Sequence, residues 1–331
     1  MFSVDFPPEG PFKILQFTDL HLGNRPEKDA LTYALVEDMV NDQAPDLLVF
    51  TGDIFTKDEA FQPTLIAEAC RRIDAFKTPW AFCMGNHEGT HGQDGVRAQK
   101  AAFMVSQSQY LLFDSGPKDV YGIGNYAISL KKHGKPAWTV FLLDSNDFTF
   151  HMIRGVPSRV HDAIRPDQIA WFQQTADTIR NLHGPVPAVA FFHVPVPEFI
   201  DAAMFEPYLG DRGQKVTTPP LNTGFFAAAL AQRDLRAMFV GHDHTNSFCA
   251  DVLGIPLAYG RCSGYGCNAP AQFPRGARVI LLWPDESLET YPLLHRPKQE
   301  RGSRPAVYRP EEKRSGPVYD RFHFFPQEKM Y

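Results

Sequence analysis

The stretch "FKILQFTDLHLG", residues 12–23, joins an apolar run to a polar end. Its β-branched and aromatic content predicts a buried strand. Helical spacing over residues 27–43 and 64–76 alternates with two more such runs, "DLLVFTGD" at 46–53 and "TPWAFCMGNHE" at 78–88. Strands that alternate with helices predict parallel strands in an α/β fold. Open sheets of this kind bind ligands at the carboxyl ends of their strands.

The rest of the chain continues the α/β pattern less regularly. A helix over residues 97–106 is expected to precede two adjacent strands, and residues 146–165 are predicted to be irregular. Further apolar runs end in polar residues, as in "PAVAFFH" and "LRAMFVGHDH". We therefore predict helices at 165–182 and 222–233, and strands at 121–130, 136–145, 187–193 and, as the final strand, 276–284. Residues 235–244 are predicted to form a strand that ends in a polar turn.

Composition narrows the classes of function. The chain has 331 residues, 44% of them hydrophobic, and a formal net charge of −5. This balance gives no support to a nucleic-acid binder, which usually carries a basic face. No apolar run reaches the roughly 18 residues needed to span a membrane. The N-terminus lacks the features of a signal peptide, so a cytoplasmic location is expected unless a signal has been trimmed.

Five cysteines, an odd and sparse set, do not indicate a disulfide framework. Cys262 and Cys267 bracket "SGYG", and this spacing would allow them to pair or to bind metal. Free, partly buried thiols are the simpler interpretation.

Polar residues that follow apolar runs form five stations along the chain. Any one of them has an ordinary explanation, such as a turn or a helix cap for an aspartate. Five in order on one predicted sheet are harder to dismiss. Carboxylates, imidazoles and an amide, without thiolates, suit Mn²⁺, Fe or Zn²⁺. These residues are too many to be ligands of one catalytic metal ion, which keeps an open coordination position. They fit two metal ions that share one carboxylate ligand. The stations are Asp19 with His21, Asp53, Asn86 with His87, His193, and His242 with His244.

The order D-x-H, G-D, G-N-H-E, a single strand-end H and G-H-x-H resembles the calcineurin-like metallophosphoesterase superfamily. The segments "FFHVPVPEF", "NTGFFAAAL", "FVGHDHTNSFC" and "YGRCSGYG" are similar to a small branch related to the purple acid phosphatases. The resemblance covers residues 12–284. It implies a four-layer αββα sandwich, in which helices flank two mixed β-sheets and a metal site lies at the strand C-terminal ends. We expect residues 1–290 to form this catalytic domain.

The resemblance also implies roles for individual residues. One metal would be held by Asp19, His21, Asp53 and His244, and the other by Asp53, Asn86, His193 and His242. Asp53 would bridge the two, and a metal-bridging hydroxide would attack the phosphorus. His87 would contact the phosphoryl group or protonate the leaving group. Glu88 stands where the family more often has aspartate, and it could orient that imidazole.

One position departs from the purple enzymes. They place an iron-binding tyrosine three residues after the bridging aspartate, where this chain has Thr56. The site therefore resembles the metallophosphoesterases that accept several divalent metals, and the resident ions would be Mn, Fe or Zn.

Loops above the strand ends are candidates for substrate binding. Residues 146–165 offer His151, Arg154, Arg159, His161 and Arg165, and the guanidinium fork suits phosphate oxygens. A solvated basic surface is the alternative. The glycine-rich segment after His87 carries His91 and could form a rim. The predicted substrate-binding set is Asn86, His87, Arg154, Arg159, Arg261 and Tyr265.

The favoured function is a dinuclear metal-dependent phosphomonoesterase acting on small phosphate esters. A phosphodiesterase acting on cyclic nucleotides or other diesters is an alternative within the enzymes. A non-catalytic protein-binding scaffold is the alternative of another class. A nuclease would need a basic groove that the sequence does not show.

The aromatic-rich extension at 291–331 is expected to pack on the domain or on a partner subunit in a homo-oligomer, and a disordered tail is the alternative.

Overall fold

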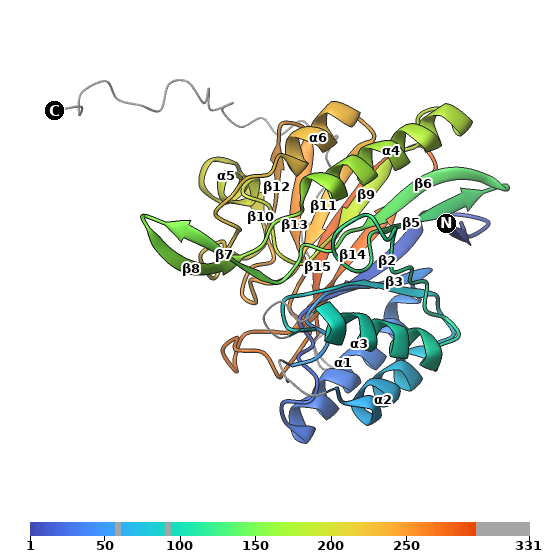
Figure 1. Ribbon diagram of the computed structural model, residues 1–331. Helices are drawn as coiled ribbons and strands as arrows, with labels where there is room; N and C mark the ends of the chain where they lie inside the picture. Colours follow the sequence, from blue (N-terminus) through green and yellow to red (C-terminus); the bar gives the residue numbers. More distant parts are fainter. Residues whose placement is uncertain (57–60, 90–93, 296–331) are drawn as a thin grey trace.

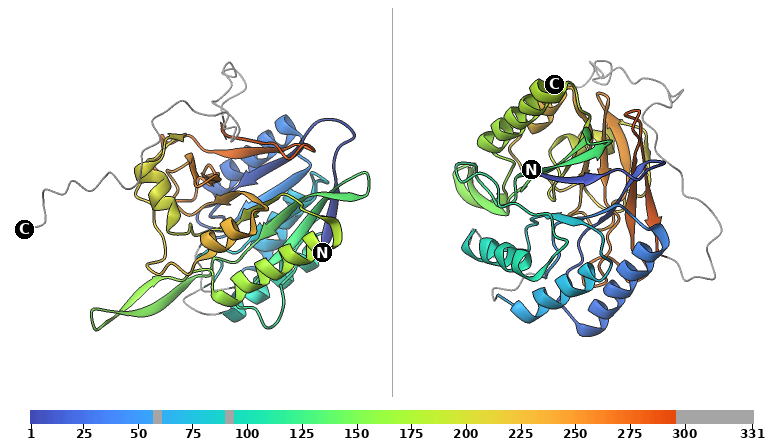
Figure 2. Two further views of the ribbon diagram at one scale, coloured as in Figure 1. Left: turned by 90° about the horizontal axis from the view of Figure 1, so that it is seen from above. Right: turned by 90° about the vertical axis from the view of Figure 1, so that its right-hand side faces the viewer.

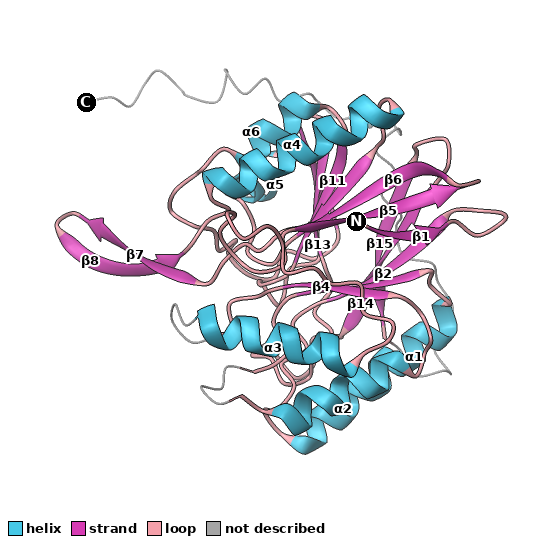
Figure 3. Cartoon of the chain, turned by 45° about the vertical axis from the view of Figure 1, so that its right-hand side comes forward, coloured by secondary structure: helices cyan, strands magenta, loops and turns pink. Residues whose placement is uncertain are grey.

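The computed structural model describes residues 1–56, 61–89 and 94–295. Two β-sheets lie face to face, and helices cover the outer face of each (Figure 1; Figure 3). This arrangement confirms the predicted αββα sandwich.

The smaller sheet has five strands in the order β15-β14-β2-β3-β4. Its three parallel strands are the ones predicted from residues 12–88, and two antiparallel strands complete it. Because the parallel strands are buried on both faces, they appear in the sequence as continuous apolar runs. The strands are β2 (Phe12–Phe17), β3 (Leu47–Thr51), β4 (Trp80–Cys83), β14 (Gly276–Leu282) and β15 (Leu288–Leu294).

The larger sheet has eight strands in the order β1-β5-β6-β9-β11-β13-β12-β10. Its centre, β6-β9-β11-β13, is parallel, and antiparallel strands flank this centre. The strands are β1 (Phe2–Asp5), β5 (Tyr126–Lys132), β6 (Lys135–Leu142), β9 (Ala188–Phe191), β10 (Tyr208–Leu209), β11 (Leu235–Val240), β12 (Cys249–Val252) and β13 (Ile255–Tyr259).

Six helices form the outer layers of the described residues. Helices α1, α2 and α3 lie against the smaller sheet, and α4, α5 and α6 against the larger one (Figure 1). Pro26, Pro63 and Pro166 begin α1, α2 and α4, where a missing backbone N–H costs no helical hydrogen bond. The helices are α1 (Pro26–Gln43), α2 (Pro63–Asp74), α3 (Asp94–Gln107), α4 (Pro166–His183), α5 (Glu198–Phe205) and α6 (Phe225–Gln232).

Strand β9 shows how the layers are held together. Its alternate side chains point to opposite faces of the sheet. Val189 and Phe191 enter the core between the two sheets, whereas Ala188 and Ala190 face the core under α4 and α6. All four are buried. Strand β9 therefore has no solvated face, and the polar residue of this segment, His193, follows the strand end.

The region between β6 and α4 corrects the prediction of an irregular stretch at 146–165. It contains an antiparallel hairpin of β7 (Phe148–Ile153) and β8 (Val156–His161). Arg154 and Gly155 have φ of 51° and 81°, and two positive φ angles are what a tight two-residue hairpin turn requires. The hairpin projects from the body of the molecule (Figure 1; Figure 2).

The C-terminal part also differs from the expectation. The strand at 276–284 is not the final one, because β15 follows it and continues past the predicted domain boundary at residue 290. Residues 296–331, to which we assigned packing on the domain or a partner, lie outside the described residues. Within the described part of the chain, no helix has the length and apolar character needed to cross a membrane.

Candidate metal centre

The polar stations converge at one edge of the sandwich because each follows the carboxyl end of a strand. Asp19 and His21 follow β2, Asp53 follows β3, and Asn86 and His87 follow β4, while His193 follows β9 and the histidines of "GHDH" follow β11. Four of these residues have positive φ, namely Asp19 at 55°, His21 at 47°, Asp53 at 51° and His242 at 77°. Non-glycine residues rarely adopt this conformation, and such strain is typical of functional sites.

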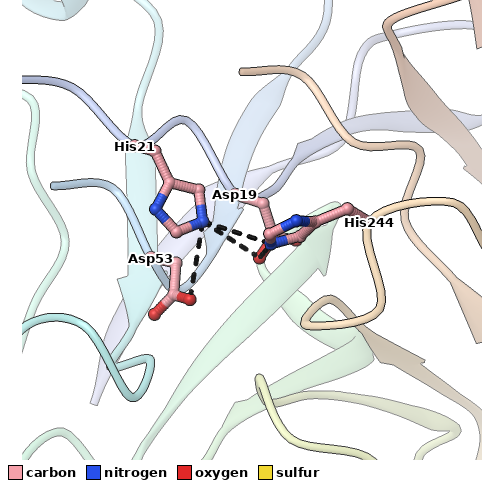
Figure 4. Close-up of side chains that lie close together, drawn as sticks. All are labelled: Asp19, His21, Asp53 and His244. Atoms are coloured by element: carbon pink, nitrogen blue, oxygen red, sulfur yellow. Dashed lines mark hydrogen bonds and ion pairs between the residues drawn. The ribbon is translucent and has the colours of Figure 1, made fainter. Parts of the chain in front are cut away.

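The first group consists of Asp19, His21, Asp53 and His244 (Figure 4). Nε2 of His21 lies 3.2 Å from Nε2 of His244 and 3.7 Å from Oδ2 of Asp53. Oδ1 of Asp19 lies 3.9 Å from Nε2 of His21 and 3.4 Å from Nε2 of His244. The four side chains therefore present their ligand atoms to a common point.

The second group contains Asp53, His193 and His242. Nε2 of His193 lies 3.2 Å from Oδ2 of Asp53 and 3.3 Å from Nδ1 of His242. Oδ1 of Asn86 lies 3.1 Å from the same His193 nitrogen and adds an amide oxygen. Nδ1 of His193 donates to the carbonyl of Thr51 at 2.8 Å. This bond directs Nε2 toward the group, as neighbouring hydrogen bonds do for metal-binding histidines.

Each aspartate divides its two oxygens between the protein and the centre. Oδ2 of Asp19 accepts hydrogen bonds from the Thr18 hydroxyl at 2.7 Å and from the backbone N–H of His242 at 3.1 Å. Oδ1 of Asp19 is buried and accepts no hydrogen bond from the described residues. Oδ1 of Asp53 accepts from the backbone N–H of His87 at 2.8 Å, while Oδ2 of Asp53 faces both groups. The free oxygens are the ones that a metal would need.

The buried carboxylates are stabilised by the imidazoles around them. Burial alone would raise the pKa of Asp19, yet the His244 imidazole, whose Nε2 lies 3.4 Å from Oδ1 of Asp19, lowers it to about 2. The pKa of Asp53 is likewise held well below its usual range, with His193 the largest influence against burial. In return, and also against burial, Asp53 raises the pKa of His193 to about 9, and Asp19 together with Cys267 raises that of His244 to about 11. In the absence of metal, protons on these imidazoles compensate the anions, and a cation can take their place.

The donor set fits metal ions on both chemistry and spacing. Nitrogen and oxygen ligands bind Zn²⁺ and similar ions at about 2.0–2.2 Å, so neighbouring ligand atoms in a tetrahedral site are about 3.4 Å apart. The spacings in the second group, 3.1 to 3.3 Å, and those in the first, 3.2 to 3.9 Å, bracket this value. The two groups, with Asp53 common to both, are consistent with a two-metal site.

Glu88 anchors the loops that carry the centre. Its Oε2 accepts hydrogen bonds from the backbone N–H groups of Asp53 at 3.0 Å and Gly85 at 2.6 Å, and its Oε1 from those of Ile54 at 2.6 Å and Phe55 at 3.4 Å. Both oxygens are thus used by the backbone. The expectation that Glu88 orients the imidazole of the preceding histidine is replaced by a role in holding two loops together.

His87 lies at the edge of the first group. Its imidazole is 31% exposed, and Nε2 lies 3.9 Å from Oδ2 of Asp53. The ring meets that of His21 edge-on, with centroids 4.8 Å apart. Its buried Nδ1 has no hydrogen-bond partner within the described ranges. His87 is therefore placed beside the centre with one face toward solvent, as the expected contact with a phosphoryl group requires.

The predicted substrate-binding residues outside the centre have different positions. Arg261 is buried, its guanidinium donates to Asp211, Ser247 and the carbonyl of Pro274, and it lies 3.8 Å from the ring centroid of Phe273. These contacts use the Nε and Nη1 donors and favour a structural role for Arg261 over the predicted substrate contact.

Arg154 is also poorly placed for the expected role. It stands at the hairpin turn, roughly 20 Å along the strand direction from Phe148. Tyr265 is half-buried and packs against the core, and Arg275 lies 5.6 Å from the centroid of its ring. Arg159 lies on β8, two residues before His161, and its guanidinium stacks on the ring of Phe148. His91 lies outside the described residues.

Two contacts with the centre were not assigned from the sequence. His161, at the end of β8, packs its ring edge-on against His242, with centroids 4.6 Å apart. Cys267 lies close enough to His244 to raise the pKa of that imidazole, and its Sγ lies 3.1 Å from Sγ of Cys262. Both cysteines are buried free thiols. Nothing in the spacing of "SGYG" indicates this approach to His244, which depends on the loop after β13.

Comparisons with known proteins agree with the geometry. The family model described as "Calcineurin-like phosphoesterase" matches residues 12–246. The chain is 30% identical over 313 residues to "Probable inactive purple acid phosphatase 29" of Arabidopsis thaliana, covering 85% of this chain and 79% of that protein. It is 27% identical over 286 residues to "Phosphatase DCR2" of Saccharomyces cerevisiae, covering 78% of this chain and 48% of that protein.

Among solved structures, a dimetal phosphatase from Danio rerio shares the fold. Its TM-score is 0.58 at 12% identity, and the match covers 86% of this chain and 96% of the other. The match of the family model spans most of the chain and includes every polar station at the strand ends. The chain belongs to the calcineurin-like phosphoesterase family.

Proposed function

We propose that this protein is a dinuclear metal-dependent phosphohydrolase that cleaves small phosphate monoesters. The observation that carries the proposal is the position of Oδ2 of Asp53, which lies 3.7 Å from Nε2 of His21 in one group and 3.2 Å from Nε2 of His193 in the other. A carboxylate oxygen between two sets of imidazoles suits two ions held close together.

Two bound metal ions would supply an activated water and would stabilise the charge that develops on the phosphoryl oxygens. The chain itself positions the substrate. The half-exposed imidazole of His87 can donate to a phosphoryl oxygen, and its backbone amide is tied to Asp53 at 2.8 Å. Asn86 is buried beside it, with Oδ1 3.1 Å from His193. The side chains that hold metal and the side chain that meets the ester are thus fixed to one another.

The name of the Arabidopsis relative describes that protein as inactive. In this chain the candidate ligands of both groups are present and converge, and His87 stands beside them. A scaffold that had lost catalysis would be free to lose these buried charges, which are costly to bury without a compensating cation. The intact centre supports an enzyme over a protein-binding scaffold.

The proposal is tested by hydrolysis of p-nitrophenyl phosphate. Removal of metal with a chelator is expected to abolish turnover, and Mn²⁺ is expected to restore it. The diester bis(p-nitrophenyl) phosphate provides the comparison between ester classes. Faster turnover of the monoester supports the phosphatase, whereas faster turnover of the diester would replace it with a phosphodiesterase. Full activity of the metal-free protein, or no activity on either ester with two metals bound, would refute the proposal.

A further inference from the structure

We propose that one face of the β7–β8 hairpin binds the leaving-group part of the substrate, and that this part is a flat ring that carries a second negative charge. The inference rests on the proposed function, because it takes the two metal groups as the binding site of the scissile phosphoryl group. It extends that function by naming the class of ester and the surface that recognises it.

The hairpin is joined to the metal centre through His161. The ring of this residue meets His242 edge-on, with centroids 4.6 Å apart, and lies against Phe148 with centroids 4.5 Å apart. Its buried Nδ1 accepts or donates no hydrogen bond among the described residues. The base of the hairpin is therefore part of the wall of the centre, and a ligand held there would meet the hairpin next.

The register of the two strands defines the surface that continues outward from His161. Directly opposed residues in an antiparallel pair share a face, and so do residues two apart in one strand. The pairs are Phe148 with His161, Phe150 with Arg159, and Met152 with Pro157. We call these six residues the arm face. They point to the same side of the hairpin as the ring of His161, which touches His242.

The chemistry of the arm face fits a ring with an anionic substituent. Phe150 is 70% exposed and Met152 is 67% exposed, so large apolar side chains face solvent next to a polar centre. Phe150 stands one cross-strand pair beyond His161 on this face, which is about 7 Å along the strand and about the length of an aryl group. An aromatic ring on the phosphoryl oxygen can therefore reach Phe150 while the phosphoryl group stays at the metals.

Arg159 supplies the charge. Its guanidinium lies 3.6 Å from the centroid of the Phe148 ring. It forms no ion pair with a carboxylate within the described residues. Stacking on an aromatic ring orients the guanidinium plane and leaves its N–H donors available for an anion. A carboxylate or second phosphate on the far side of a bound ring would meet these donors.

The opposite face of the hairpin provides matched controls. His151 and Ser158 are directly paired and stand between the pairs of the arm face. Because neighbouring residues in a strand point to opposite faces, His151 and Ser158 point away from the arm face. Substitution at these positions perturbs the same hairpin without altering the proposed surface.

The test measures binding of three non-hydrolysable phosphonates to the Mn²⁺-loaded full chain by isothermal titration calorimetry. We expect phenylphosphonate to bind about fivefold more tightly than methylphosphonate, since a stacked aromatic pair is worth about this much. A 4-carboxyphenyl group should add roughly threefold at low ionic strength, and 1 M salt should remove this addition. Phe150→Ala should abolish the ring preference, and Arg159→Gln only the carboxylate preference. His151→Ala and Ser158→Ala should retain both.

Three results would refute the proposed role of the arm face in binding. They are equal affinity for the three phosphonates, an unchanged ring preference in Phe150→Ala, and no binding of any phosphonate. Hydrolysis of p-nitrophenyl phosphate is followed separately in the same preparations. Ring and carboxylate preference without hydrolysis would refute the proposed function and leave the recognition surface standing. Metal-dependent hydrolysis without ring or carboxylate preference would support the proposed function and refute the role of the arm face.

Discussion

The backbone amide of His87 donates a 2.8 Å hydrogen bond to Oδ1 of Asp53, and Nε2 of the same histidine lies 3.9 Å from the other oxygen of that carboxylate. The residue proposed to join two metals thus also positions the residue proposed to meet the substrate. Metal binding and substrate contact should be separable by substitution at these two positions.

Loss of the Asp53 carboxylate should empty both metal groups, since its Oδ2 faces each of them. In Asp53→Ala and Asp53→Asn we expect the metal content after dialysis to be well below one ion per chain, compared with two in the wild type. Inductively coupled plasma mass spectrometry measures this content. Asp177→Ala, on the exposed surface of α4, is the control and should keep both ions. Two ions retained in Asp53→Ala would contradict a shared ligand.

His87→Ala should keep the metals and lose turnover. The imidazole is 31% exposed and is outside both ligand groups, so its removal leaves the donor atoms in place. A positioned imidazole typically contributes about 10²- to 10⁴-fold to the rate. We expect a fall of this size in kcat for p-nitrophenyl phosphate with the metal content unchanged. His183→Ala, at the exposed end of α4, should behave as wild type. A turnover within twofold of wild type in His87→Ala would exclude the assigned role.

Glu88→Ala should weaken both stability and metal binding. The substitution leaves four backbone N–H groups near Asp53 and Gly85 without their acceptor in a buried site. Each buried N–H group without an acceptor costs about 1–3 kcal/mol. Because the loops can relax in part, we expect the free energy of unfolding to fall by at least about 3 kcal/mol. Denaturant unfolding measures this loss in the metal-free protein. Glu88→Gln keeps one good acceptor and should lose less, and Glu9→Ala should lose nothing. Equal stability of Glu88→Ala and wild type would remove the anchoring role.

Arg261→Ala should affect the fold and not the substrate. Its guanidinium bonds to Ser247 at 3.1 Å and to the Pro274 carbonyl at 2.8 Å inside the protein. We expect a loss of about 2 kcal/mol in the free energy of unfolding, because these acceptors become unsatisfied. The KM for p-nitrophenyl phosphate should stay within about twofold of wild type. A large rise in KM at unchanged stability would return Arg261 to the substrate site.

The centre could be predicted from sequence because each of its side chains directly follows its own apolar strand. Asp53 after "LLVFTG" and His193 after "AVAFF" are placed at one sheet edge by the general geometry of parallel strands, without knowledge of strand order. The same reasoning fails for a side chain whose position depends on the path of a loop. Arg261 follows a strand too, but the path of the loop after it turns the guanidinium inward.

The β7–β8 hairpin shows the second limit. "FTFHMIRGVPSRVH" has polar and apolar residues on both faces, and its turn is Arg-Gly rather than Asn-Gly or Asp-Gly. Strand β7 alternates apolar and polar residues from Phe148 to Met152, but β8 does not, and five alternating residues without a second strand pattern are too few to predict a hairpin. His161 is one of several candidates in this segment, but its contact with His242 depends on the hairpin, so that contact could not be predicted.

Anomalous diffraction from crystals of the full chain grown with Mn²⁺ tests the central claim most directly. Two peaks about 3.5–4 Å apart are predicted, with Oδ2 of Asp53 coordinating both. One peak should also contact His21 and His244, and the other His193 and His242. A single peak, or two peaks that do not share Asp53, would contradict the account.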